Sequence, residues 1–142
     1  MVMLPSSYSS LLVRTDFGSE DRWLEVSEQA LAANELGFQA YVRPVSNRDF
    51  DGASWHTVAA AIPPTDQGAA VLFIADQTTL ASPELPILVI DILVDAAEDH
   101  PPFRCLPAHL WSVENNLNVF NLDWHDFAAN LSPDGVFRGF PS

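Results

Sequence analysis

The sequence contains no lysine; apart from four histidines, its basic side chains are six arginines. The absence of lysine excludes a Schiff-base lysine, a pyridoxal-phosphate anchor and the phosphate-binding lysine of a P-loop. Because 19 acidic residues bring the net charge to -13, the surface should repel nucleic acid and anionic membranes. We therefore expect a basic protein or a small polar ligand as partner, no nucleic acid and no membrane. Scattered acids also suit an ordinary solvated surface.

Cysteine is nearly absent as well, since Cys105 is the only one. A single cysteine excludes an intrachain disulfide and a zinc site with two cysteine ligands. The neighbouring Arg104 would lower the pKa of the thiol if both were exposed, but a small apolar residue in a strand is the favoured role. The histidines show no metal-ligand spacing, and no glycine-rich phosphate loop or GxSxG elbow is present. We expect no cofactor and no metal.

Long apolar runs are also missing. The longest, PILVIDILV, is interrupted by Asp91 and is far shorter than the roughly 20 residues that span a bilayer. The start, MVMLPSSYSS, has neither the basic region nor the apolar core of a signal peptide. These features predict a cytoplasmic protein.

What is present is a core-forming composition, with 48% of 142 residues hydrophobic and no linker or repeat. We expect one globular domain over residues 1–142. Apolar periodicity predicts an α/β (α+β) fold with a mixed β-sheet of about five strands flanked by helices, and a C-terminal helical pair. The predicted strands cover residues 10–17, 38–45, 69–76, 86–95 and 103–107. The predicted helices cover residues 19–34, 55–62 and 107–131, the last divided in two.

Several aspartates follow predicted strands, among them Asp16, Asp76, Asp91 and Asp95. Ligands of open α/β sheets bind beyond the carboxyl ends of strands, so Asp16 and Asp76 could converge on a magnesium ion or a polar substrate. Aspartates also end strands because they suit turns and helix caps, and this interpretation is preferred.

Asp91 interrupts an apolar strand, where a carboxylate is costly unless it is paired. Arg14 occupies a matching position in the first strand, so we predict a buried Arg14–Asp91 pair. The alternative is a pocket in which Arg14 grips an anionic group and Asp91 or Asp16 acts as a base.

The stretch LWSVENNLNVFNLDWHDF, residues 110–127, combines a core-facing apolar stripe with four asparagines. Asn121 or Asp123 should cap a second short helix, and we expect Asn118 to face water. Three polar residues, Glu114, Asn115 and Asn116, lie near Trp111 without an evident structural role. Together with Trp111 they are candidate ligand-binding residues.

Five stretches together resemble a family of small, acidic, single-domain bacterial proteins of unknown function: SLLVRTDF, FQAYVRPV, VLFIAD, FRCLPAHLWSVENNLNVFNLDWHDFA and DGVFRGF. The resemblance covers nearly the whole chain, and LWSVENNL and DGVFRGF are its most distinctive parts. It implies a stand-alone soluble domain, and it carries over no activity, cofactor or catalytic residue.

The sequence therefore leaves two functions open. The first is a partner-binding module, regulatory or immunity-like, whose acidic surface meets a basic protein. The second is a small-molecule enzyme or binder with a pocket between the sheet end and the Trp111 helix. Its sheet side would carry Arg14, Asp16, Asp76 and Asp91, and its helix side Trp111, Glu114 and Asn115.

Overall fold

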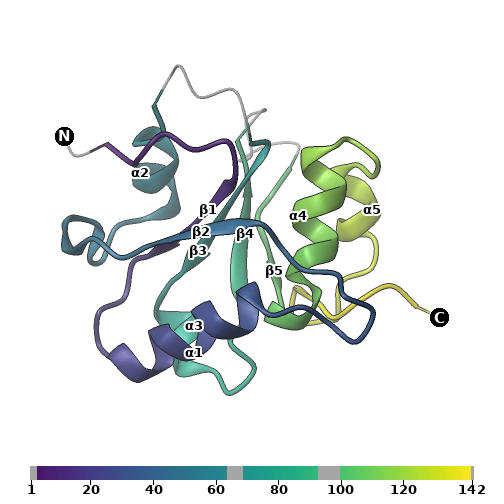
Figure 1. Ribbon diagram of the computed structural model, residues 1–142, viewed down its shortest axis with the longest axis horizontal. Coiled ribbons are helices and arrows are strands. Elements are labelled where there is room, and N and C mark those ends of the chain that lie inside the picture. The colour runs from purple at the N-terminus through teal and green to yellow at the C-terminus, as the bar shows by residue number, and fades with distance from the viewer. Residues whose placement is uncertain (1–2, 64–68, 93–99, 142) are drawn as a thin grey trace.

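The computed structural model describes residues 3–63, 69–92 and 100–141 and contains one six-stranded mixed sheet, of order β2-β1-β3-β4-β5-β6 (Figure 1). The strands are β1 (Ser10–Arg14), β2 (Val42–Val45), β3 (Val71–Ala75), β4 (Ile87–Asp91), β5 (Phe103–Cys105) and β6 (Val136–Phe137). The helices are α1 (Glu20–Leu31), α2 (Trp55–Ala60), α3 (Gln77–Ala81), α4 (Leu110–Asn118) and α5 (Trp124–Ala128), with 3-10 turns η1 (Arg48–Phe50) and η2 (Pro107–His109). This confirms the predicted α/β class with a mixed sheet.

Strand direction changes once on each side of β4. Strands β2, β1 and β3 are parallel, β4 is antiparallel to both of its neighbours, and β5 and β6 are parallel. The central strands β1 and β3 are buried along their whole length. In β3 this follows from a continuous apolar run, whereas β1 also buries Ser10 and Arg14. Pro44 lies in the edge strand β2, where the missing N–H of proline is tolerated.

Both faces of the sheet are covered, and the period-two alternation of β1 decides which side chain goes where. Leu12 packs in the core beneath α1, α4 and α5, whereas Leu11 and Val13 pack in the core beneath α2. Figure 1 shows α2 at one end of the molecule and the α4–α5 pair at the other. The larger core lies beneath α1 and the C-terminal pair α4 and α5.

Three parts of the fold differ from the prediction. Residues 77–81, expected in a loop, form α3 because Asp76 and Thr79 make a capping box. A sixth strand, β6, follows the turn at residues 132–135; two residues are too few for a periodicity signal. The strand expected over residues 86–95 ends at Asp91, and residues 93–99, among them Asp95, lie outside the described residues.

The C-terminal helical pair is confirmed. Helix α4 ends at Asn118, and α5 begins after Asp123, whose carboxylate accepts the N–H of Asp126 while the Asp126 carboxylate accepts the N–H of Asp123. Asp123 is thus the predicted cap of the second helix. Across the described ranges, no helix is long and apolar enough to cross a membrane.

Candidate binding pocket

A pocket of about 230 Å³ lies between the end of β4 and the corner that joins α4 to α5. Its walls are apolar, contributed by Ala70, Leu117, Phe120, Leu122 and Trp124. This volume is below the roughly 300–1,000 Å³ typical of pockets for drug-sized ligands. The pocket therefore suits a small ligand or a single side chain.

The polar lining of the pocket consists of Asp91, His100 and Asp123. A carboxylate oxygen of Asp91 is hydrogen-bonded to Nδ1 of His100. The side chains of Asp91 and His100 are 12% and 21% exposed, respectively. The His100 ring stacks on Trp124, with centroids 5.6 Å apart, and meets His125 edge-on at 5.2 Å. Packing and hydrogen bonding thus fix the imidazole beside the pocket.

At the corner of the pocket, the C-terminal turn of α4 has an unusual residue in its left-handed position. The N–H of Phe120 donates to the carbonyl of Leu117, and the N–H of Asn121 donates to the carbonyl of Asn116. This is a Schellman motif, in which the residue in the place of Phe120 is usually glycine. Phe120 adopts a φ of 57°, in the left-handed region. The residue is 73% exposed, so burial does not hold it in this conformation.

The predicted Arg14–Asp91 pair is wrong. Strand β3 separates β1 from β4, and because β4 runs antiparallel, its carboxyl end lies at the opposite end of the sheet from that of β1. Arg14 instead pairs with Glu20 at 2.7 Å and donates to the carbonyl of Asp16 at 2.8 Å. Its guanidinium also lies over the Phe17 ring. The charge on Arg14 is therefore satisfied within its own strand-to-helix connection.

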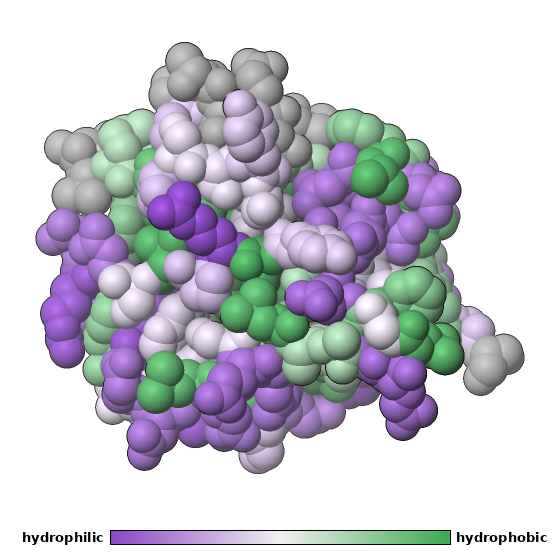
Figure 2. Space-filling model, viewed as in Figure 1, coloured by the Kyte–Doolittle hydropathy of each residue, from purple (hydrophilic) through white to green (hydrophobic). Residues whose placement is uncertain are grey.

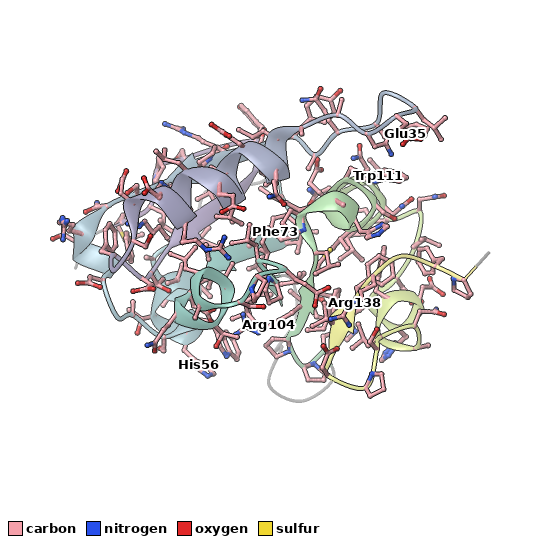
Figure 3. The ribbon with its side chains drawn as sticks, turned by 90° about the horizontal axis from the view of Figure 1, so that it is seen from below. Glu35, His56, Phe73, Arg104, Trp111 and Arg138 are labelled. Atoms are coloured by element: carbon pink, nitrogen blue, oxygen red, sulfur yellow. The ribbon has the colours of Figure 1, made fainter. Side chains whose placement is uncertain are left out.

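Asp16 and Asp76 have structural partners, as the preferred interpretation predicted. The Asp16 carboxylate accepts the N–H of Gly18 at 3.1 Å and shapes the turn before α1. The Asp76 carboxylate caps α3 through the N–H of Thr79 and receives two N–H groups of Arg104, at 2.9 and 2.8 Å. Figure 3 shows Arg104 close to α3. Asp91 is the only one of the four candidate catalytic residues that lines the pocket.

Hydrogen bonding lowers the pKa of Asp76. Partial burial opposes ionisation of this carboxyl group, but the hydrogen bonds and positive charge of Arg104 and the Thr79 N–H outweigh it. For Cys105, burial raises the pKa of the thiol far above its ordinary value. The thiol is thus unreactive, as expected for an apolar strand residue. Within the described ranges, no three His, Cys, Asp or Glu side chains form a group that could hold a metal ion.

The polar residues near Trp111 hold the segment that leads into β2. Glu114, only 6% exposed, accepts the N–H of Tyr41, and Asn115 donates to the carbonyl of Gln39 at 3.3 Å. Trp111 stacks on Phe38 with ring centroids 4.8 Å apart; in Figure 3 it lies on the helix beside the loop that carries Glu35. These residues are not among those that line the pocket, and the prediction that they bind a ligand stays a prediction.

Two further asparagines of α4 also have intramolecular partners. Asn116 donates to the carbonyl of Ser112 at 2.8 Å and accepts from Asn121 at 2.9 Å. Asn118 does not simply face water, contrary to expectation: it accepts the N–H of Ala70 and donates to Ser10. Asn118, together with Glu114 and Asn115, thus forms a hydrogen-bonding seam between α4 and the strand region, whereas the bonds of Asn116 stay within α4 and the turn that follows it.

The sequence interpretation missed most of the pocket, namely His100, Leu117, Phe120, Leu122 and Trp124 as lining residues. In the sequence, the one signal for the pocket was Asp91, a carboxylate within an apolar strand. Its partner His100 follows the strand in a segment without periodicity, so no pattern could connect the two.

A family model described as a domain of unknown function (DUF6924) matches residues 9–140. This match confirms the resemblance to a family of unknown function over nearly the full length. No curated protein matches the sequence.

Proposed function

The chain belongs to the DUF6924 family, domains of unknown function, and we propose that it is a binding module whose pocket at the α4–α5 corner receives a cationic group. The observation that carries the proposal is the lining of this pocket. Apolar walls are combined with the carboxylates of Asp91 and Asp123, and no arginine is among the lining residues that the structure describes. Such a lining favours a cation over an anion, because its two carboxylates face a single imidazole, that of His100, which is itself hydrogen-bonded to Asp91.

Four physical effects would favour a cation with an apolar stem. Carboxylates in a partly desolvated site interact with a positive charge more strongly than carboxylates in water do. Phe120 lines the pocket, so its aromatic ring is available for a cation–π contact, and the apolar walls of the pocket remove the stem from water. The net charge of -13 also raises the rate of encounter with a positively charged molecule.

The first test uses benzylammonium as a probe and benzyl alcohol as its neutral counterpart. We expect benzylammonium to perturb the NMR signals of Trp124 and His100, because both line the pocket, and benzyl alcohol to bind at least tenfold more weakly. Asp91→Asn keeps the shape of the side chain and removes its charge, so it should weaken benzylammonium binding about tenfold or more.

The matched control for this test is Asp134→Asn, because Asp134 is a carboxylate paired with Arg138 outside the pocket. This variant should bind benzylammonium as wild type does. Equal binding of the charged and neutral probes, or no loss of binding in Asp91→Asn, would contradict the proposal.

A second prediction concerns nucleic acids, which the negative charge of the protein disfavours as partners. At physiological salt we expect no retention of DNA or RNA in a gel-shift assay at micromolar protein, because the six arginines form no basic stripe in the sequence. A shifted band that disappears with added salt would contradict this expectation. A cytoplasmic location, expected from the sequence, likewise stays a prediction.

A further inference from the structure

Phe120 contributes an exposed aromatic ring from a backbone position that disfavours it. Among the described residues, Leu85 and Phe120 are the non-glycine residues with positive φ. Leu85 is only 1% exposed, so burial of its side chain offsets the strain of its backbone, whereas Phe120 is 73% exposed. Core packing therefore does not explain why phenylalanine occupies a site that suits glycine.

The neighbouring residue extends this apolar surface. Val119, 69% exposed, precedes Phe120 at the α4–α5 corner, and Phe120 also lines the pocket. Figure 2 shows hydrophobic side chains over this end of α4, surrounded by hydrophilic ones. A ligand that fits within about 230 Å³ fills the pocket and leaves much of this corner in water. The corner thus offers apolar contact area beyond what a free small molecule requires.

We propose that the cationic group is an arginine or lysine side chain of a basic protein segment, with the partner's adjacent apolar side chains packed on Val119 and Phe120. This inference rests on the proposed function and names the partner of that same pocket. Charge complementarity supports it, because Asp91 and Asp123 face the pocket and the whole chain is acidic. The pocket volume matches one long side chain better than a drug-sized ligand.

The experiment compares three probes by isothermal titration calorimetry: benzylammonium, arginine blocked at both ends, and a heptapeptide alternating arginine with leucine. We expect the heptapeptide to bind at least tenfold more tightly than blocked arginine. Val119→Ser should remove most of that gain while leaving benzylammonium binding unchanged, because Val119 flanks the pocket without lining it. Phe120→Gly should weaken heptapeptide binding further.

Thermal unfolding separates a binding role of Phe120 from a structural one. Phe120→Gly relieves the left-handed strain, so its Tm should equal that of wild type or exceed it by about 2 °C. The matched control Leu85→Gly should unfold well below wild type, since it deletes a buried side chain.

The outcomes distinguish the inference from the proposed function. If benzylammonium binds but the heptapeptide binds no more tightly than blocked arginine, the pocket takes a free cation and the inference is wrong. The inference is also wrong if Val119→Ser binds the heptapeptide as tightly as wild type does. If none of the three probes binds, the proposed function falls together with the inference.

Discussion

Replacing Asn118 by aspartate is expected to lower the free energy of unfolding by about 3–4 kcal/mol. The Asn118 amide donates to Ser10 Oγ and to Glu114 Oε2, each at 3.0 Å, and its oxygen accepts the N–H of Ala70 at 2.7 Å. Aspartate keeps the accepted bond and loses both donated ones. It also places a second carboxylate beside that of Glu114, and two unit charges 4 Å apart repel by about 4 kcal/mol at an effective dielectric constant near 20. Urea denaturation at pH 7 measures the loss.

Asn34→Asp is the matched control for this substitution. Asn34 uses only its side-chain oxygen, which accepts the N–H groups of Leu36 and Phe38 at 2.9 and 3.0 Å. A carboxylate provides the same acceptor, so this variant should unfold close to wild type. If Asn118→Asp also matched wild type, the seam between α4 and the strands would not be a stabilising network.

Asp76→Ala is expected to lower the free energy of unfolding on the order of 3 kcal/mol. The substitution removes the cap of α3, typically about 0.5–2 kcal/mol, together with charge-assisted hydrogen bonds to Arg104, about 1.5–3 kcal/mol. Asp76→Asn keeps a capping oxygen and should lose less. Urea denaturation of both variants separates the effect of the cap from the effect of the charge.

The effect of the Asp76 charge should depend on pH. The pKa of Asp76 is lower in the folded protein than its ordinary value, so its ionised form stabilises the fold above about pH 4–5. That contribution is lost as pH falls through the lowered pKa. The difference in stability between wild type and Asp76→Asn should therefore be largest near neutral pH and shrink below about pH 4. A difference that grew on acidification would contradict this account.

The control for Asp76→Ala is Asp134→Ala. Asp134 also pairs with an arginine, Arg138, at 2.9 Å, but its side chain is 54% exposed. Exposed ion pairs contribute little because solvent screens them. The Tm of Asp134→Ala should therefore lie close to that of wild type. A loss as large as that of Asp76→Ala would mean that the cap and partial burial of Asp76 are not what makes it stabilising.

Local signals explain which elements were predicted correctly. The strand at residues 71–75 is a continuous apolar run, and the helix at residues 20–31 carries apolar residues at spacings of three and four. The cap at Asp123 was recognised because capping needs only neighbouring residues. Helix α3 and strand β6 were missed, as five and two residues are too few for a period to show.

The candidate site was predicted far less well, for a reason that concerns strand direction. The sequence indicated that Arg14 and Asp91 each needed a partner, but it left open whether their strands were parallel. Because β4 is antiparallel, the two charges lie at opposite ends of the sheet and pair instead with Glu20 and His100. Asn118 was misassigned similarly, because Ser10 and Ala70, which it contacts, are distant in the chain.

The sequence by itself determined the α/β class, the excluded lysine and disulfide chemistries and the acidic charge, since each follows from composition or from neighbouring residues. Only the tertiary structure decided the strand order, the partners of the charged residues and the pocket. It brought Asp91 and His100 together beside Trp124, and it set Phe120 in a left-handed turn at the rim. Contacts between residues distant in the chain leave no period in the sequence, because they depend on how whole strands and helices pack.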